Sequence, residues 1–141
     1  MIRKYNEGDL DRLMEIWLNE NLSAHEFVDA DYWKNNVPYV REALTEADLY
    51  IYEEDNQIKG FAGVVDGYLA GIFVTNSYHR QGIGQRLLST VKENYNEIAL
   101  DVYEKNKQAY QFYLKNQFDV IAKKVDEESN EVELTMLYKA E

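Results

Sequence analysis

Two glycines stand directly before a helical pattern in Val74–Leu88, VTNSYHRQGIGQRLL, and this stretch decides the fold. An apolar strand pattern runs into it, and Gly82 and Gly84 lie at its turn. Apolar residues then recur at helical spacing, at Ile83, Leu87, Leu88 and Val91. The stretch is therefore predicted to be a strand, a glycine loop and the start of a helix.

A glycine loop in this position is a candidate anion site. The first turn of a helix carries N–H groups without partners and partial positive charge, and glycine lets the backbone approach a phosphate closely. Arg80 and Arg86 are candidates to assist. A P-loop is excluded because its lysine is absent, and the Rossmann fingerprint lacks its third glycine. Taken alone, the loop is equally typical of a structural turn.

The composition indicates one globular domain over residues 1–141. The chain is 45% apolar and 13% aromatic, and a domain of this length buries enough surface to form a core without disulfides. It contains no cysteine, which excludes disulfides, thiolate zinc sites and a cysteine nucleophile. Its two histidines, His25 and His79, are too few for a typical structural metal site, so no metal is expected.

The net charge and the N-terminal sequence restrict the expected partners and the expected cellular location. A net charge of −11 argues against a nucleic-acid partner, because phosphate binding needs a basic surface. The same charge suits a cationic substrate such as an amine, and it equally suits plain solubility. Residues 1–11 lack a signal-peptide core and no apolar run reaches about 18 residues, so we expect a cytoplasmic protein without a membrane span.

Apolar spacing and turn residues predict the order of the elements. We expect a strand at 1–5, a helix opening at Gly8–Asp9, a polar break at 19–27 and a helix at 31–44. Three strands in series then end with 68–74, and Asp66–Gly67 is a hairpin signal between the last two. The remaining expectations are a helix to about Asn94, a strand at 97–103, a helix at 106–116 and a hairpin of strands at 118–125 and 131–138.

This order, β-α-α-β-β-β-α-β-α-β-β, predicts an α/β fold with a central mixed sheet. Short turns imply antiparallel pairing, whereas the strand–helix–strand unit at 68–103 needs a right-handed crossover and is predicted to bring parallel strands together. Helices then cover the faces of the sheet.

A second motif lies downstream, in LDVYEKNKQAYQFYLKNQF, with its key residues at Asn106, Ala109, Phe112, Tyr113 and Phe118. It resembles the second signature of the GNAT superfamily, the acetyl-CoA-dependent N-acetyltransferases. The glycine stretch resembles the first signature, [Q/R]-x-x-G-x-[G/A] behind a strand. The two motifs stand in the family's order, and the resemblance covers nearly the whole chain. The chain departs from the pattern at His79, where Gln or Arg is usual, and at Gln117, where a glycine commonly precedes the aromatic residue.

The resemblance implies where acetyl-CoA binds. The fourth and fifth strands splay apart to admit the pantetheine arm, and the backbone of Ile72, Phe73 and Val74 pairs with it. Backbone N–H groups of the loop hold the pyrophosphate, at His79, Arg80, Gln81, Gly82, Ile83, Gly84 and Gln85. Asn106 either caps its helix or binds the arm, and both roles are compatible.

The chemistry implied is direct attack of an amine on the thioester, which needs a base, an oxyanion donor and an acid for the thiolate. Tyr113 matches the family's acid position, and an ordinary phenol is protonated at neutral pH. The general base is left open. His25 has a suitable ordinary pKa but is as well explained as a structural residue. The weaker base candidates are Glu26, Asp101 and Tyr103.

The function predicted is a cytoplasmic N-acetyltransferase that moves the acetyl group of acetyl-CoA to a primary amine. The acceptor is a small molecule, a protein lysine or a protein N-terminus. One alternative is a catalytically silent acyl-CoA-binding regulatory module. Another is an oligomerising structural domain, for which the C-terminal strand EVELTMLYK is a candidate edge. A monomer and a homodimer are both compatible with the sequence.

Overall fold

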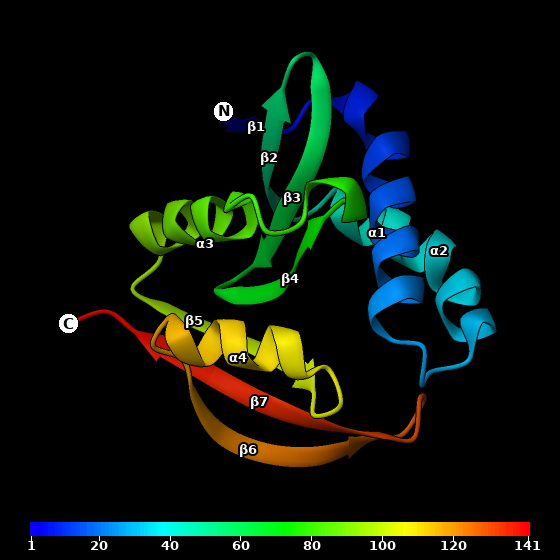
Figure 1. The fold of residues 1–141 in the computed structure, drawn as a ribbon, viewed down its shortest axis with the longest axis vertical. Coiled ribbons are helices and arrows are strands. Elements are labelled where there is room, and N and C mark those ends of the chain that lie inside the picture. The colour runs from blue at the N-terminus through cyan, green and yellow to red at the C-terminus, as the bar shows by residue number, and fades with distance from the viewer.

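A computed structural model describes every residue from Met1 to Glu141. Its strands form one seven-stranded sheet in the order β1-β2-β3-β4-β5-β7-β6 (Figure 1). The strands are β1 (Ile2–Lys4), β2 (Asp48–Glu54), β3 (Gln57–Val65), β4 (Tyr68–Val74), β5 (Glu97–Tyr103), β6 (Asp119–Asp126) and β7 (Glu131–Lys139). Neighbouring strands are antiparallel except β4 and β5, which are parallel. The predicted α/β fold with a mixed sheet is confirmed.

Helices cover both faces of the sheet. They are α1 (Leu10–Ala24), α2 (Ala30–Leu44), α3 (Ile83–Asn94) and α4 (Lys107–Lys115), with short 3₁₀ turns η1 (Glu7–Asp9) and η2 (Asn76–Tyr78). The apolar faces of α1 and α2 pack on one side of the sheet, and those of α3 and α4 pack on the other, so the core has two separate layers. No helix of the structure has both the length and the apolar character needed to cross a bilayer.

The first helix is longer than the sequence predicted. The expected polar break at 19–27 is wrong in its first part, because α1 continues to Ala24. The reason lies at Asn21, which is buried, and whose Nδ2 donates to the carbonyl of Trp17 at 2.9 Å. A polar side chain that is satisfied within its own helix does not end it.

A gap opens between β4 and β5. The two strands share a single register pair, Tyr68 with Ala99, and are not paired beyond it. This is the splay that the resemblance implied.

One carboxylate lies beside the closed end of this gap. Asp101 on β5 accepts hydrogen bonds from the hydroxyl of Tyr68 on β4 at 2.9 Å and from Thr135 on β7 at 2.6 Å. Lys124 on β6 lies 3.4 Å from the same carboxylate. Asp101 therefore ties four strands together where the gap begins.

The C-terminal hairpin is present, but its edge differs from the expectation. β7 pairs with β5 on one side and β6 on the other, so EVELTMLYK is an interior strand. β6 is the edge, and it exposes Val120, Ile121 and Val125. A hairpin pattern predicts that two strands pair but not which of them meets the rest of the sheet.

Candidate active site

The glycine loop presents a continuous run of free backbone donors. Gly82, at φ 79°, is the left-handed residue that caps α3, and Arg80 also has a positive φ, 66°. No hydrogen bond is formed by the six N–H groups from Arg80 to Gln85, and pairing resumes where Arg86 N–H donates to the Gly82 carbonyl at 3.0 Å. A Cβ built on Gly82 would meet no atom within 4 Å, so no protein group crowds this residue. Unpaired donors at a helix N-terminus form an anion site.

His79 anchors this loop. Its Nε2 lies 2.7 Å from the carboxylate of Glu20 on α1 and 2.7 Å from the carbonyl of Val74. Its own N–H donates to the Asn76 carbonyl at 3.3 Å, so that group lies outside the free run. Burial raises the pKa of Glu20, and the hydrogen bond from His79 opposes that rise. The imidazole therefore faces α1 and the end of β4.

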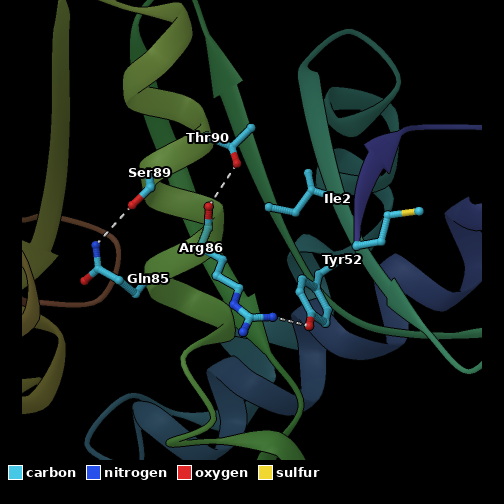
Figure 2. Close-up of a pocket in the computed structure, with 7 residues that line it drawn as sticks. Ile2, Tyr52, Gln85, Arg86, Ser89 and Thr90 are labelled. Atoms are coloured by element: carbon cyan, nitrogen blue, oxygen red, sulfur yellow. Dashed lines mark hydrogen bonds between the residues drawn. The ribbon is translucent and has the colours of Figure 1, made fainter.

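The two arginines near the loop differ in what they contact. Arg86 Nη1 donates to the hydroxyl of Tyr52 at 2.9 Å, and Figure 2 shows this side chain directed away from α3 toward Tyr52 on β2. The cavity at this point measures about 350 Å³ and is lined by Met1, Ile2, Tyr52, Gln85, Arg86, Ser89 and Thr90. Arg80 is exposed and forms no hydrogen bond or ion pair with its side chain. Of the two, Arg80 is the one free to meet an anion.

The end of β4 divides its side chains between the two core layers. Ile72 and Val74 pack with the layer under α3 and α4, whereas Phe73 packs with the other layer. The Phe73 ring lies over Gly71, where a Cβ would come within 2.3 Å of it. The hydroxyl of Thr75, just past β4, is buried and has no partner, and the sequence had not singled it out. An unpartnered buried hydroxyl beside an open strand edge suits a ligand that supplies a hydrogen bond.

Tyr113 lies on α4 in the α3/α4 core layer. It is 8% exposed and packs edge-on against Phe112 and Phe118. Its hydroxyl has no hydrogen-bond partner in the structure. Burial raises the pKa of Tyr113 above its ordinary value, so the phenol stays protonated throughout the neutral range. A protonated hydroxyl without a protein partner is available to donate to a ligand.

His25 and Asn106 contact each other, although the sequence places them far apart. Asn106 Nδ2 lies 3.0 Å from His25 Nε2, and Asn106 also caps α4, because its Oδ1 accepts from Ala109 N–H at 3.2 Å. His25 Nδ1 lies 3.1 Å from Asn21 Oδ1. Burial lowers the pKa of His25 to about 4, so the imidazole is neutral at physiological pH.

The other base candidates occupy different surroundings. Glu26 is exposed, and Asp101 is held by its contacts at the closed end of the gap. Tyr103 is buried, and burial raises its pKa. The aromatic cluster around His25 was not predicted from the sequence and consists of Phe27, Trp33 and Tyr103. No local pattern joins residues from a loop, a helix and a distant strand.

The structure therefore has a gap between β4 and β5 and a run of free amides at the start of α3, in a chain whose two sequence motifs resemble those of acetyl-CoA-dependent transferases. A family model described as the acetyltransferase (GNAT) domain matches residues 18–137. The chain belongs to this family and is an acetyltransferase.

Curated relatives and solved structures are similar to this chain. The chain is 35% identical over 123 residues to the peptidyl-lysine N-acetyltransferase YiaC of Escherichia coli strain K12, and the match covers 86% of this chain and 84% of that relative. The solution structure of apo-form YjaB from Escherichia coli has a TM-score of 0.85 at 26% identity, covering 100% of this chain and 98% of that one. PaiA N-acetyltransferase from Thermoplasma acidophilum, in complex with coenzyme A, has a TM-score of 0.79 at 21% identity, covering 99% and 98%.

Proposed function

We propose that this acetyltransferase moves the acetyl group of acetyl-CoA to the side-chain amine of a protein lysine. One observation supports acetyl-CoA as the donor: free N–H groups run from Arg80 to Gln85, beside the unpaired edge of β4. The relatives named as peptidyl-lysine N-acetyltransferases, at 35% and 28% identity, support the acceptor. A net charge of −11 also favours a cationic acceptor such as lysine.

The donor would be held mainly by backbone groups. The pyrophosphate would accept hydrogen bonds from the amides of the loop, and Arg80 is free to add a charged one. The pantetheine arm would lie in the gap, along the backbone of Ile72, Phe73 and Val74, with the Asn106 amide beside it. The Val74 carbonyl already accepts from His79, so that residue has a fixed orientation at the mouth of the gap.

Tyr113 would act as the general acid. When the neutral lysine amine attacks the thioester carbonyl and the C–S bond breaks, the attacking nitrogen gives up one proton to solvent and another proton must reach the leaving thiolate. The Tyr113 hydroxyl is protonated, because burial raises its pKa, and it donates to no protein group. Donation to sulfur would leave a buried phenolate, which solvent then reprotonates before the next turnover.

Release of coenzyme A thiol with different acceptors tests the acceptor. A peptide with a free lysine is expected to support turnover, whereas the same peptide with acetylated lysine and a free N-terminus is expected to support little. Thiol release with a polyamine or an N-terminal amine, and none with lysine, would show that the acceptor is not a protein lysine. Tight acetyl-CoA binding without release for any amine would instead indicate a silent binding module.

Tyr113→Phe tests the acid, with Tyr110→Phe on the same helix as its matched control. Tyr113→Phe is expected to bind acetyl-CoA with unchanged affinity and to lower kcat by about 10²-fold or more, since general acid catalysis contributes about 10²–10⁴-fold. Tyr110→Phe should leave kcat within about twofold. Wild-type turnover in Tyr113→Phe would remove this residue from the mechanism.

A further inference from the structure

A chain of hydrogen bonds with a defined direction links α1 to the cap of α4. Asn21 Nδ2 donates to the Trp17 carbonyl, so Asn21 presents Oδ1 to His25. An amide oxygen only accepts, so His25 Nδ1 carries the proton. The neutral ring therefore presents a lone pair at Nε2, which accepts from Asn106 Nδ2 at 3.0 Å.

The same chain fixes the orientation of the Asn106 amide. Its Oδ1 faces the Ala109 N–H at the start of α4, and its Nδ2 faces His25. One Nδ2 hydrogen and one Oδ1 lone pair remain for a ligand. Without His25, only the cap contact would orient this side chain.

The His25 ring is held in place by aromatic neighbours on several elements. It stacks on Trp33 of α2 with ring centroids 5.2 Å apart and an interplanar angle of 26°. Tyr103 of β5 and Phe27 meet it edge-on at 4.9 Å and 5.7 Å. None of these neighbours carries a carboxylate, and burial alone lowers the His25 pKa. An immobile neutral ring is a fixed hydrogen-bond acceptor.

A role for His25 as general base would need different geometry. Its Nε2 lone pair is already used by Asn106, and its Nδ1 carries a proton that Asn21 accepts. A proton taken from an amine at Nε2 would break the bond to Asn106 and place an uncompensated charge inside the aromatic cluster.

We propose that His25 is a positioning residue that sets the orientation of the Asn106 amide for acetyl-CoA. This hydrogen bond connects the loop after α1, which contains His25, to the N-terminus of α4 at Asn106. The α1–α2 side of the sheet is thereby linked to the proposed donor site. This assignment rests on the proposed binding of acetyl-CoA along the gap.

Two substitutions of His25 distinguish the contributions of its two ring nitrogens. The terminal amide atoms of glutamine reach the place of Nε2, so His25→Gln keeps an acceptor for Asn106. The terminal atoms of asparagine reach only the place of Nδ1, so His25→Asn keeps the contact with Asn21 and loses the one with Asn106. We expect His25→Asn to bind acetyl-CoA about tenfold more weakly, as for the loss of one oriented hydrogen bond. His25→Gln should stay within about threefold of wild type in both binding and kcat.

A double-mutant cycle shows whether the effect passes through Asn106. Asn106→Ser keeps a capping oxygen for Ala109 and removes the amide donor. In the Asn106→Ser background, His25→Asn should cause no further loss of acetyl-CoA affinity, whereas a general loss of structure would add to it. Calorimetric titration with acetyl-CoA measures all four affinities and requires no turnover.

The protonation state gives a second, spectroscopic readout. Nitrogen-15 spectra of the two histidines should show one ring that stays neutral with its proton on Nδ1 down to about pH 5, and His79→Gln assigns it. If His25→Gln and His25→Asn lose kcat equally, and the acid limb of the pH–rate profile disappears in both, His25 is a general base and not a positioning residue. Equal acetyl-CoA affinity in His25→Asn and wild type would also overturn the positioning role. Failure of the wild type itself to bind acetyl-CoA would overturn the proposed function instead.

Discussion

Acidification should unfold this protein partly through His25. The pKa of a histidine is about 6.5 in an unfolded chain, and burial lowers that of His25 to about 4 in the folded protein. Between these pH values the unfolded state binds more protons than the folded state, so stability falls as the pH is lowered through this window and is fully present above it. From about pH 7.5 to about pH 5, His25 alone should cost about 2 kcal/mol of unfolding free energy.

Urea unfolding at both pH values, in wild type and His25→Gln, measures this cost. Other groups titrate in the same range, and burial raises the pKa of Glu20 and Glu133, which gives the opposite sign. These contributions occur in both proteins and cancel in the difference. The wild type should therefore lose about 2 kcal/mol more than His25→Gln on acidification. An equal loss in both proteins would mean that His25 keeps an ordinary pKa in the folded state, which would refute its burial as a neutral ring.

Two further substitutions test backbone conformation. Gln117 follows α4 with a left-handed φ of 69°, so Gln117→Gly should raise the unfolding free energy by about 0.5–1 kcal/mol. Lys115, two residues earlier, is helical, so Lys115→Gly should lower the unfolding free energy by about the same amount. Thermal unfolding measures both variants, and a loss of stability in both would refute the strain at Gln117. Gly82→Ala must adopt φ 79°, which is strained for alanine, so the loop is expected to shift and acetyl-CoA affinity to fall about tenfold or more. Gly84→Ala, whose Cβ would meet its nearest atoms at 3.9 Å, should bind within about twofold of wild type in the same titration.

The fold could be predicted largely from local pattern. Apolar periodicity located the helices and strands, and the strand–helix–strand unit at 68–103 identified the parallel pair. The length of α1 was missed because Asn21 reads as a break in sequence, while in the helix its amide is satisfied by Trp17. The interior place of β7 depends on its pairing with β5, which is a contact between distant segments.

Some features of the candidate site likewise follow from local sequence, whereas others depend on contacts between distant segments. The glycine loop was predicted because a glycine turn at a helix N-terminus is a local structure, and Gln117, noted as a departure from the family's glycine, has a positive φ in the structure. The contact between His25 and Asn106 was not predicted, since 81 residues separate them. The place of His79 against Glu20 likewise depends on how α1 packs against the end of β4. Side-chain partners across elements are set by tertiary packing.

The proposed donor site is made of backbone N–H groups, which every residue except proline possesses. Side chains on the surface of the loop can change without removing its N–H donors, provided that Gly82 keeps its left-handed conformation. In this proposal a net charge of −11 on the whole chain is compatible with an anionic donor, because the loop presents its N–H groups locally. If the proposed function holds, substitutions elsewhere on the surface are expected to alter the choice of amine more than the binding of the donor.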